Sequence, residues 1–268
     1  MILKQVLISS YLAQSYTSFI GIALMPVYLH YIGIEAFGLV GFFLMLQSWL
    51  QLLDLGLTPT LSREVSLFRA GSHNAQTTWQ RLRSLEWILG GLAILCILSF
   101  WFSQSWIAIN WLKVRNLELV ATCVFLMGLS GTLRWLTGLY RAGLVGLEKQ
   151  LWVNSLLVIF TTLKFVVVFP VIALADSPPL AFFEFQTVIC LAEFSVFARM
   201  LYRSLPEYPR SIWPCPVALK AMWPTASAMA FMAGMWIFLT QIDKLILSRV
   251  LPLEAFGYFT LAVTVAGG

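Results

Sequence analysis

Ile34-Glu35-Ala36-Phe37-Gly38 decides how this chain is organised, because the stretch returns almost unchanged as Leu253-Glu254-Ala255-Phe256-Gly257. Each copy follows a long apolar run and opens another, and the two copies lie 219 positions apart. The alternative is a chance match in a biased composition, but the shared position relative to the apolar runs favours a true repeat. We therefore expect a complete first unit over residues 1–220 and the start of a second over 221–268.

The composition is that of a protein folded in a bilayer. Hydrophobic residues make up 60% and charged residues 11% of the chain, and the mean hydropathy is +0.85. Soluble domains carry about 25% charged residues, so this deficit predicts an all-α polytopic membrane protein. The four cysteines have no paired spacing, so neither a metal site nor a redox pair is expected, and no cofactor is implied.

A helix that crosses a bilayer needs about 20 mostly apolar residues. Runs of that length lie at about Val6–Leu29, Glu35–Leu55, Leu85–Trp106, Leu117–Tyr140, Leu151–Ala175, Leu180–Tyr202 and Pro224–Val250. We read Gly56–Arg83 as a polar connection between the second and third of these runs. Glu254–Gly268 opens a further run that is too short to cross. The expected architecture is a six-helix bundle and the start of a second, parallel one, in an apparently truncated chain.

Lysine and arginine gather on one side of the predicted membrane. The far side carries only Lys113, Arg115 and Arg249, whereas the side of the N-terminus carries Lys4, Arg63, Arg69, Arg81, Arg83, Arg141, Lys149, Arg199, Arg203, Arg210 and Lys220. Cytoplasmic loops are rich in Lys and Arg, so the N-terminus is expected in the cytoplasm. This topology accounts for the net charge of +5, and no nucleic-acid partner is needed.

The number of crossings between the two repeat copies decides how the two units are related. That number is even, so both copies open on the same side of the membrane and the units are parallel. Parallel repeats related by an axis along the membrane normal are found in transporters whose substrate path lies between two halves.

Ionisable residues deep in the predicted spans mark the candidate site, because each costs roughly 2.5 kcal/mol or more in hydrocarbon and usually faces inward. Lys164 and Glu193 lie near the midplane, and Gln186 shares a helix face with Glu193. Arg134 lies on a face with small residues that let helices approach closely. One interpretation pairs Lys164 with Glu193 in a structural ion pair and lets Arg134 extend to the interface. The other has Arg134 and Lys164 line a cationic cavity for an anionic substrate, with Glu193 and Gln186 beside them.

Two further polar groups are candidates. Gln47, Gln51 and Asp54 form a stripe at helical spacing, and we assign them a structural or gating role. Asp54 lies at the negative end of its helix and requires a cation, for which Arg63 is the nearest candidate. Asp243 and its neighbour Lys244 point about 100° apart, so one of them is expected to face a cavity between the halves and to contact substrate.

Three sequence motifs carry a family resemblance. They are Leu53-Asp54-Leu55-Gly56-Leu57 followed by Arg63, then Arg141-Ala142-Gly143-Leu144-Val145-Gly146-Leu147-Glu148 with Asn154, and Gln241-Ile242-Asp243-Lys244 leading through Leu251-Pro252 into Glu254-Ala255-Phe256-Gly257. On these residues the chain resembles the polysaccharide or O-antigen flippases of the MATE-like multidrug/oligosaccharidyl-lipid/polysaccharide exporter superfamily. The resemblance covers the whole chain, although family members complete the second bundle.

The resemblance implies a transporter rather than an enzyme. Its substrate would be a polyprenyl-diphosphate-linked oligosaccharide, moved from the cytoplasmic to the outer leaflet of a bacterial inner membrane by alternating access. The implied partners are membrane lipid, a polysaccharide polymerase and chain-length proteins.

Two other functions remain open. A multidrug or organic cation antiporter of the same superfamily would prefer acidic groups in its N-terminal cavity, and this chain offers bases as well. A membrane-embedded glycan polymerase or glycosyltransferase would need a large outer loop with catalytic carboxylates or arginines. The complete outer loops are short, and the sequence offers no acid pair, metal cluster or phosphate-binding glycine loop.

Overall fold

The structure is a computed structural model, and it describes residues 2–24, 27–28, 31, 33–54, 56–72, 74–112, 117–206 and 213–267. These residues are helical apart from short connections. Lys113, Arg115 and Arg210, which entered the charge comparison, lie outside them, as does the side chain of Glu35. The helices are α1 (Ile2–Ala23), α3 (Ile34–Leu50), η1 (Gln51–Asp54), α4 (Leu57–Arg69), α5 (Ala75–Trp106), η2 (Ile107–Trp111), α6 (Leu117–Gly146), α7 (Gln150–Thr162), η3 (Leu163–Val167), α8 (Val168–Ala173), α9 (Pro178–Ser204), α10 (Pro216–Val250) and α11 (Leu253–Gly267).

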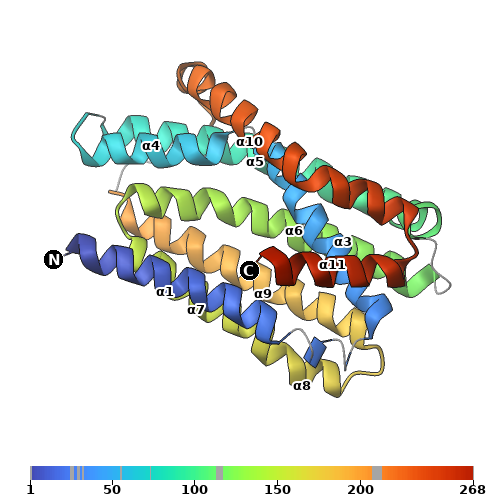
Figure 1. Cartoon of the computed structure of the whole chain (residues 1–268). Helices are drawn as coiled ribbons and strands as arrows, with labels where there is room; N and C mark the ends of the chain where they lie inside the picture. The colour runs from blue at the N-terminus through green and yellow to red at the C-terminus, as the bar shows by residue number, and fades with distance from the viewer. Residues whose placement is uncertain are drawn as a thin grey trace.

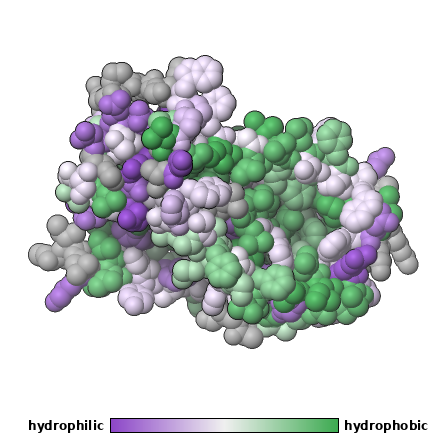
Figure 2. Space-filling view, turned by 90° about the horizontal axis from the view of Figure 1, so that it is seen from above, coloured by the Kyte–Doolittle hydropathy of each residue, from purple (hydrophilic) through white to green (hydrophobic). Residues whose placement is uncertain are grey.

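The long helices run back and forth between two ends of the molecule (Figure 1). The N-terminus and the α4–α5, α6–α7 and α9–α10 connections lie at one end, called here the N-terminal end. The α5–α6, α8–α9 and α10–α11 connections lie at the other end, called here the far end. In the face shown by Figure 2, hydrophobic residues cover the middle and hydrophilic residues gather toward both ends, as expected for a molecule that crosses a bilayer.

Six helical stretches are long and apolar enough to cross a membrane, and they confirm the all-α polytopic class. They are Phe37–Asp54, Ala75–Trp111, Glu118–Gly146, Gln150–Ala173, Pro178–Ser204 and Met222–Val250. The predicted first span, Val6–Leu29, coincides with α1 as far as Ala23, and its crossing of the membrane stays a prediction. Both repeat copies open a helix, since α3 begins at Ile34 and α11 begins at Leu253.

The prediction of a polar connection over Gly56–Arg83 is wrong. The segment folds into α4 and the first turns of α5, so the third span begins at Ala75 rather than at Leu85. The low mean hydropathy of this segment hid an amphipathic pattern, in which one apolar stripe suffices to form a packed helix. Leu61 and Val65 are buried against residues of α5 such as Leu82.

Gly56 bends the chain between η1 and α4 and provides the surface on which α10 packs. Its φ of 68° is left-handed, a conformation that glycine adopts without strain. A Cβ atom at this position would overlap the carbonyl oxygen of Ala226 and approach the backbone nitrogen of Ala230 to 2.6 Å. The first long helix of the predicted second unit is thereby held against the first unit, through α3, α4 and α5.

Glycines of the Arg141–Glu148 motif allow α4 and α9 to pack closely on α6. A Cβ atom on Gly146 would lie 3.0 Å from the Cβ of Val65, and one on Gly143 would lie 2.8 Å from a methyl carbon of Leu201. At the end of the motif, Glu148 adopts a positive φ of 56° and its carboxylate lies 2.7 Å from Arg69 on α4. The motif therefore has a packing role at the N-terminal end of the bundle.

The two helices that begin with the repeat, α3 and α11, pack against one another, and both run from the far end toward the N-terminal end (Figure 1). A Cβ atom on Gly41 would lie 2.9 Å from the Cβ of Thr260, and these two residues are 219 positions apart, the interval of the repeat. When a residue contacts the residue that corresponds to it in the other copy of a repeat, a local two-fold axis passes close to the contact. Two parallel units would make this contact, and the second unit itself stays a prediction.

The effect of the close contact at Gly56 on stability can be measured separately from the effect of its left-handed backbone conformation. Replacing Gly56 with Ala is expected to lower the melting temperature of the purified protein more than replacing Gly71, whose φ is 79° and whose Cβ position is open. Both changes place a side chain in the left-handed region, at a cost of about 1–2 kcal/mol, but only Gly56→Ala also displaces α10. Equal melting temperatures for the two variants would contradict the close contact.

Candidate functional site

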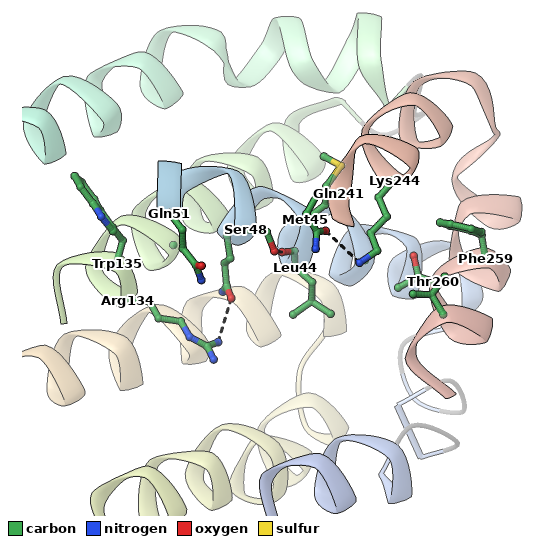
Figure 3. A pocket seen from close by; sticks show the side chains of 14 residues that line it. Leu44, Met45, Ser48, Gln51, Arg134, Trp135, Gln241, Lys244, Phe259 and Thr260 are labelled. Atoms are coloured by element: carbon green, nitrogen blue, oxygen red, sulfur yellow. Dashed lines mark hydrogen bonds between the residues drawn. The ribbon is translucent and has the colours of Figure 1, made fainter. Parts of the chain in front are cut away.

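A cavity of about 260 Å³ lies where α3, α6, α10 and α11 meet (Figure 3). Helices of the first unit and of the predicted second unit therefore both contribute to it. Its described lining includes two cations and no carboxylate. The lining residues are Gly41, Leu44, Met45, Gln47, Ser48, Gln51, Gly131, Arg134, Trp135, Gln241, Lys244, Phe259, Thr260 and Val263.

Arg134 reaches the cavity from α6 and is oriented by α3. Its Nη1 donates a hydrogen bond of 3.1 Å to Oε1 of Gln47. Gly131, one turn earlier on α6, leaves room for Leu50, since a Cβ atom there would lie 2.8 Å from a methyl carbon of that leucine. The Nε2 atom of Gln47 is buried and has no hydrogen-bond partner among the described residues. A ligand with acceptor oxygens would find donors at both side chains.

Lys244 lines the cavity from α10, on the side formed by the predicted second unit (Figure 3). Its Nζ donates a 3.1 Å hydrogen bond to Oε1 of Gln241, which lies one turn earlier on the same helix. Asp243 is exposed and does not line the cavity. Of the adjacent pair, the cation is therefore the member that faces the cavity, and the carboxylate lies outside the lining.

Lys164, Glu193 and Gln186 lie together at a separate place, between η3 and α9. Lys164 and Glu193 form an ion pair and are only 5% and 8% exposed. Nε2 of Gln186 donates a 3.1 Å hydrogen bond to the carbonyl oxygen of Lys164. This geometry corresponds to the first interpretation, a structural ion pair, and the three residues lie outside the lining of the cavity that holds Arg134.

The helix that carries Lys164 widens locally into a π-helical turn over Leu163–Val167. Such a turn leaves carbonyl groups without their usual intrahelical partners. The hydroxyl of Tyr28 donates to the carbonyl oxygens of Phe165 at 3.1 Å and Lys164 at 3.4 Å, and Gln186 supplies a further donor. Side chains from outside the helix thus hold the turn in place, and with it the position of the buried ammonium group.

The predicted pairing of Asp54 with Arg63 is wrong. The Asp54 carboxylate accepts hydrogen bonds from the backbone N–H of Thr58, at 3.2 and 3.3 Å, and from its hydroxyl. These donors belong to the first turn of α4, where free amides and the positive end of the helix dipole favour a carboxylate. The sequence analysis did not predict α4, so it could not predict that Thr58, in the first turn of α4, would be the partner of Asp54. Gln47 and Gln51, from the same predicted stripe, line the cavity.

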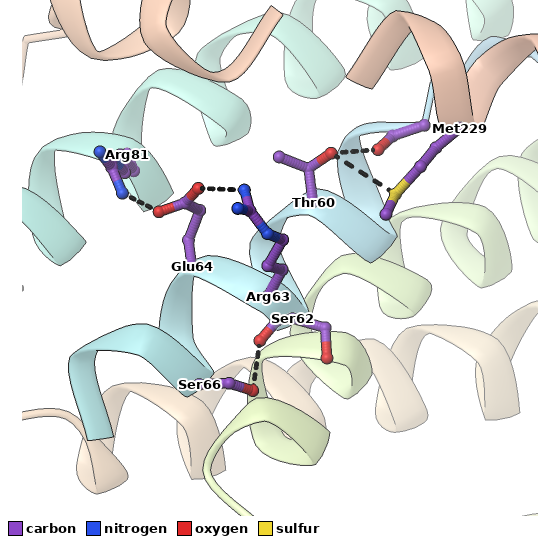
Figure 4. Close-up of polar contacts among 8 residues, drawn as sticks. Thr60, Ser62, Arg63, Glu64, Ser66, Arg81 and Met229 are labelled. Atoms are coloured by element: carbon purple, nitrogen blue, oxygen red, sulfur yellow. Dashed lines mark hydrogen bonds and ion pairs between the residues drawn. The ribbon is translucent and has the colours of Figure 1, made fainter. Parts of the chain in front are cut away.

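The sequence analysis missed an ion cluster between α4 and α5. The buried Glu64 carboxylate pairs with Arg81 and lies 3.6 Å from Arg63 (Figure 4). A second group lies nearby on α5, where Arg83 donates 2.8 Å hydrogen bonds to Glu86 and to the hydroxyl of Tyr202. The amphipathic pattern of Leu57–Arg69 was the sequence signal that would have placed Glu64 on a packed helix. Both clusters hold the helices together near the N-terminal end.

No protein-family model, curated protein or solved structure matches this chain. Among the residues that the structure describes, no group of three or more His, Cys, Asp or Glu side chains is placed to hold a metal ion.

The buried ion pair predicts a non-additive mutational effect. Lys164→Met strands the Glu193 carboxylate and is expected to lower the free energy of unfolding by about 3–5 kcal/mol. Adding Glu193→Leu removes the stranded charge, and the double variant is expected to recover most of that loss. Thermal unfolding of the purified variants measures both effects. A double variant as unstable as Lys164→Met would show that the two groups are not coupled.

Proposed function

We propose that the chain belongs to a transporter that moves a polyprenyl-diphosphate-linked oligosaccharide across a bacterial inner membrane by alternating access, with its N-terminus in the cytoplasm. The observation that carries the proposal is the cavity among α3, α6, α10 and α11, which combines Arg134 and Lys244 with no carboxylate in its described lining. Such a cavity favours an anionic ligand over a cationic one.

The donors suit a phosphate and its neighbouring hydroxyl groups. A guanidinium group binds phosphate oxygens through two parallel hydrogen bonds, and an ammonium group adds a compact positive charge. The carboxamides of Gln47, Gln51 and Gln241 both donate and accept, as hydroxyl groups require. Trp135 and Phe259 add apolar surface to the same lining.

The volume of the cavity limits how much of the proposed substrate it can enclose. Pockets that enclose a drug-sized ligand measure roughly 300–1,000 Å³, whereas this cavity measures about 260 Å³. It therefore holds the part of a head group closest to the cations, while the rest of the glycan lies outside. A polar head group loses its hydrogen bonds in hydrocarbon, so a polar passage is what its transfer requires, and the lipid chain can remain in the bilayer.

Single substitutions of the two cations test the proposal in a bacterial host whose surface polysaccharide depends on the protein. Arg134→Ala and Lys244→Ala are each expected to reduce surface polysaccharide at least tenfold at unchanged protein level, because a hydrogen bond to a charged group is worth about 1.5–3 kcal/mol. Arg134→Lys keeps the charge but loses the planar fork, so an intermediate loss is expected.

Matched controls use cations that do not line the cavity. Arg199→Ala on α9 and Lys220→Ala on α10 remove exposed charges and should leave surface polysaccharide unchanged. Wild-type polysaccharide in both cavity variants would refute the cavity assignment. Cavity-dependent efflux of a cationic dye would instead favour the antiporter, and incorporation of labelled sugar by the purified protein would favour a glycan polymerase or glycosyltransferase.

A further inference from the structure

We propose that Arg141 is a second anion-binding position on α6, which receives the head group at the N-terminal end before that group reaches Arg134 in the cavity. This inference rests on the proposed function and deepens it, since it names the side from which the ligand enters and a residue that binds it there. The chemistry recognised is a diphosphate carried on a lipid chain.

Arg141 and Arg134 lie on the same face of α6. They are seven residues apart, which is close to two turns of about 3.6 residues each, so their side chains leave the helix in nearly the same direction. At about 1.5 Å per residue, about 10 Å separates the two positions along the helix axis. α6 ends with Gly146 at the N-terminal end (Figure 1), so Arg141 lies between that end and Arg134.

The surface of α6 between the two arginines is open. Gly138 lies between them on the same face, and no described atom lies within 4 Å of the place that its Cβ would take. Both arginine side chains are exposed. At the other described glycines of α6, a Cβ atom would come within 3.0 Å of a residue on a neighbouring helix; these are Gly128, Gly131, Gly143 and Gly146. The face that bears the arginines is thus left open where other faces of α6 are packed.

The neighbours of the two arginines place this open face inside the bundle. Arg134, at one end of it, lines the cavity and donates its hydrogen bond to Gln47 of α3. Arg141, at the other end, lies close enough to Glu193 of α9 for the two charges to interact, and Glu193 is itself buried. A ligand at Arg141 is therefore on the inner side of α6, next to the path along which Arg134 lies.

Protein carboxylates do not balance the charges along this face. Glu193 already forms the ion pair with Lys164, and neither Arg134 nor Arg141 forms an ion pair with any described residue. Lys244 adds a further cation in the cavity. Like charges repel strongly where the dielectric constant is low, and an anion between them is attracted to each. The planar fork of a guanidinium group matches two oxygens of a phosphate.

A cysteine at Gly138 can measure the electrostatic potential beside Arg141, because the space next to this glycine is open. Two methanethiosulfonate reagents of opposite charge, the anionic ethylsulfonate and the cationic ethyltrimethylammonium, are applied to inverted membrane vesicles, whose outer surface is the N-terminal side. Each reaction rate with the Gly138→Cys variant is divided by the rate with glutathione. The anionic reagent is expected to be favoured, and the ratio of the two normalised rates is called here the anion preference.

Substitution of Arg141 in the Gly138→Cys variant should change the anion preference according to charge. Arg141→Gln is expected to lower it about fivefold, because the cation attracts one reagent and repels the other. Arg141→Lys keeps the charge and should retain most of the preference. The protein without Gly138→Cys, which keeps its four native cysteines, gives the background. An anion preference that Arg141→Gln does not lower would overturn the inference.

Arg199 provides a matched control on α9. Arg141 and Arg199 each lie five residues before the end of a helix that stops at the N-terminal end, and both are exposed. Arg199 lies about 120° around its helix from Glu193, so it points away from the buried ion pair. Arg199→Gln should leave the anion preference unchanged. An equal fall in both variants would show that the preference reports only the general positive charge of this end, and the inference would be wrong.

Protection by a lipid diphosphate tests the ligand. Farnesyl diphosphate, added to the same vesicles, should slow the reaction of the Gly138→Cys variant with the anionic reagent. Arg141→Gln should raise the concentration needed for half-maximal protection about tenfold, because a hydrogen bond between charged groups is lost. Dihexanoyl phosphatidylglycerol carries a single phosphodiester and should protect poorly. Equal protection by this phospholipid would assign Arg141 to ordinary lipid head groups, and absence of protection by farnesyl diphosphate would remove the ligand; either result overturns the inference.

Surface polysaccharide separates this inference from the proposed function. If Arg134→Ala lowers polysaccharide while Arg141→Gln changes neither the anion preference nor the protection, the function stands and the second position does not. If Arg141→Gln lowers both, but Arg134→Ala and Lys244→Ala leave polysaccharide at the wild-type level, the anion-binding position stands and the proposed function is wrong.

Discussion

The architecture depends on how closely α10 and α11 approach α3 and the bend that follows it. Gly38 and Gly41 bring α11 against α3, and Gly56, between η1 and α4, brings α10 against the same group of helices. In hydrocarbon, helix association relies on packing and on polar contacts between helices rather than on the hydrophobic effect. A larger residue at any of these glycines would therefore push α10 or α11 away from the helices it packs on and disturb the cavity that both helices line.

Charges inside the bundle fall into two groups that differ in their partners. Lys164 with Glu193, and Arg81 with Glu64, are carboxylate–cation pairs that hold helices together away from the cavity. The two cavity cations, Arg134 and Lys244, have carboxamide partners, which accept hydrogen bonds but do not neutralise charge. This difference in partners, rather than depth in the membrane, separates the groups available to an anion from the groups that serve the fold.

The candidate site shows which features a local sequence pattern can predict and which it cannot. Sequence spacing placed Arg134 on a glycine-bearing helix face, and that face does border the cavity. It left Lys164 between two interpretations, because spacing along one helix does not show whether Glu193 of another helix lies within reach. Asp54 was paired with the wrong partner for a related reason, since its acceptor role depends on α4, an amphipathic helix that mean hydropathy does not detect.

Local sequence was enough to predict the all-α class, most of the apolar helices and the two helix starts at Glu35-Ala36-Phe37-Gly38 and Glu254-Ala255-Phe256-Gly257. Each of these follows from hydropathy and local pattern, because the bilayer forces the backbone to satisfy its own hydrogen bonds within a helix. The folded structure was needed to show that the two repeat helices touch, which of the two interpretations of Lys164 and Glu193 fits, and that Arg134 and Lys244 share a cavity. These relations join residues far apart in the chain and depend on helix rotation and separation, which no local pattern encodes.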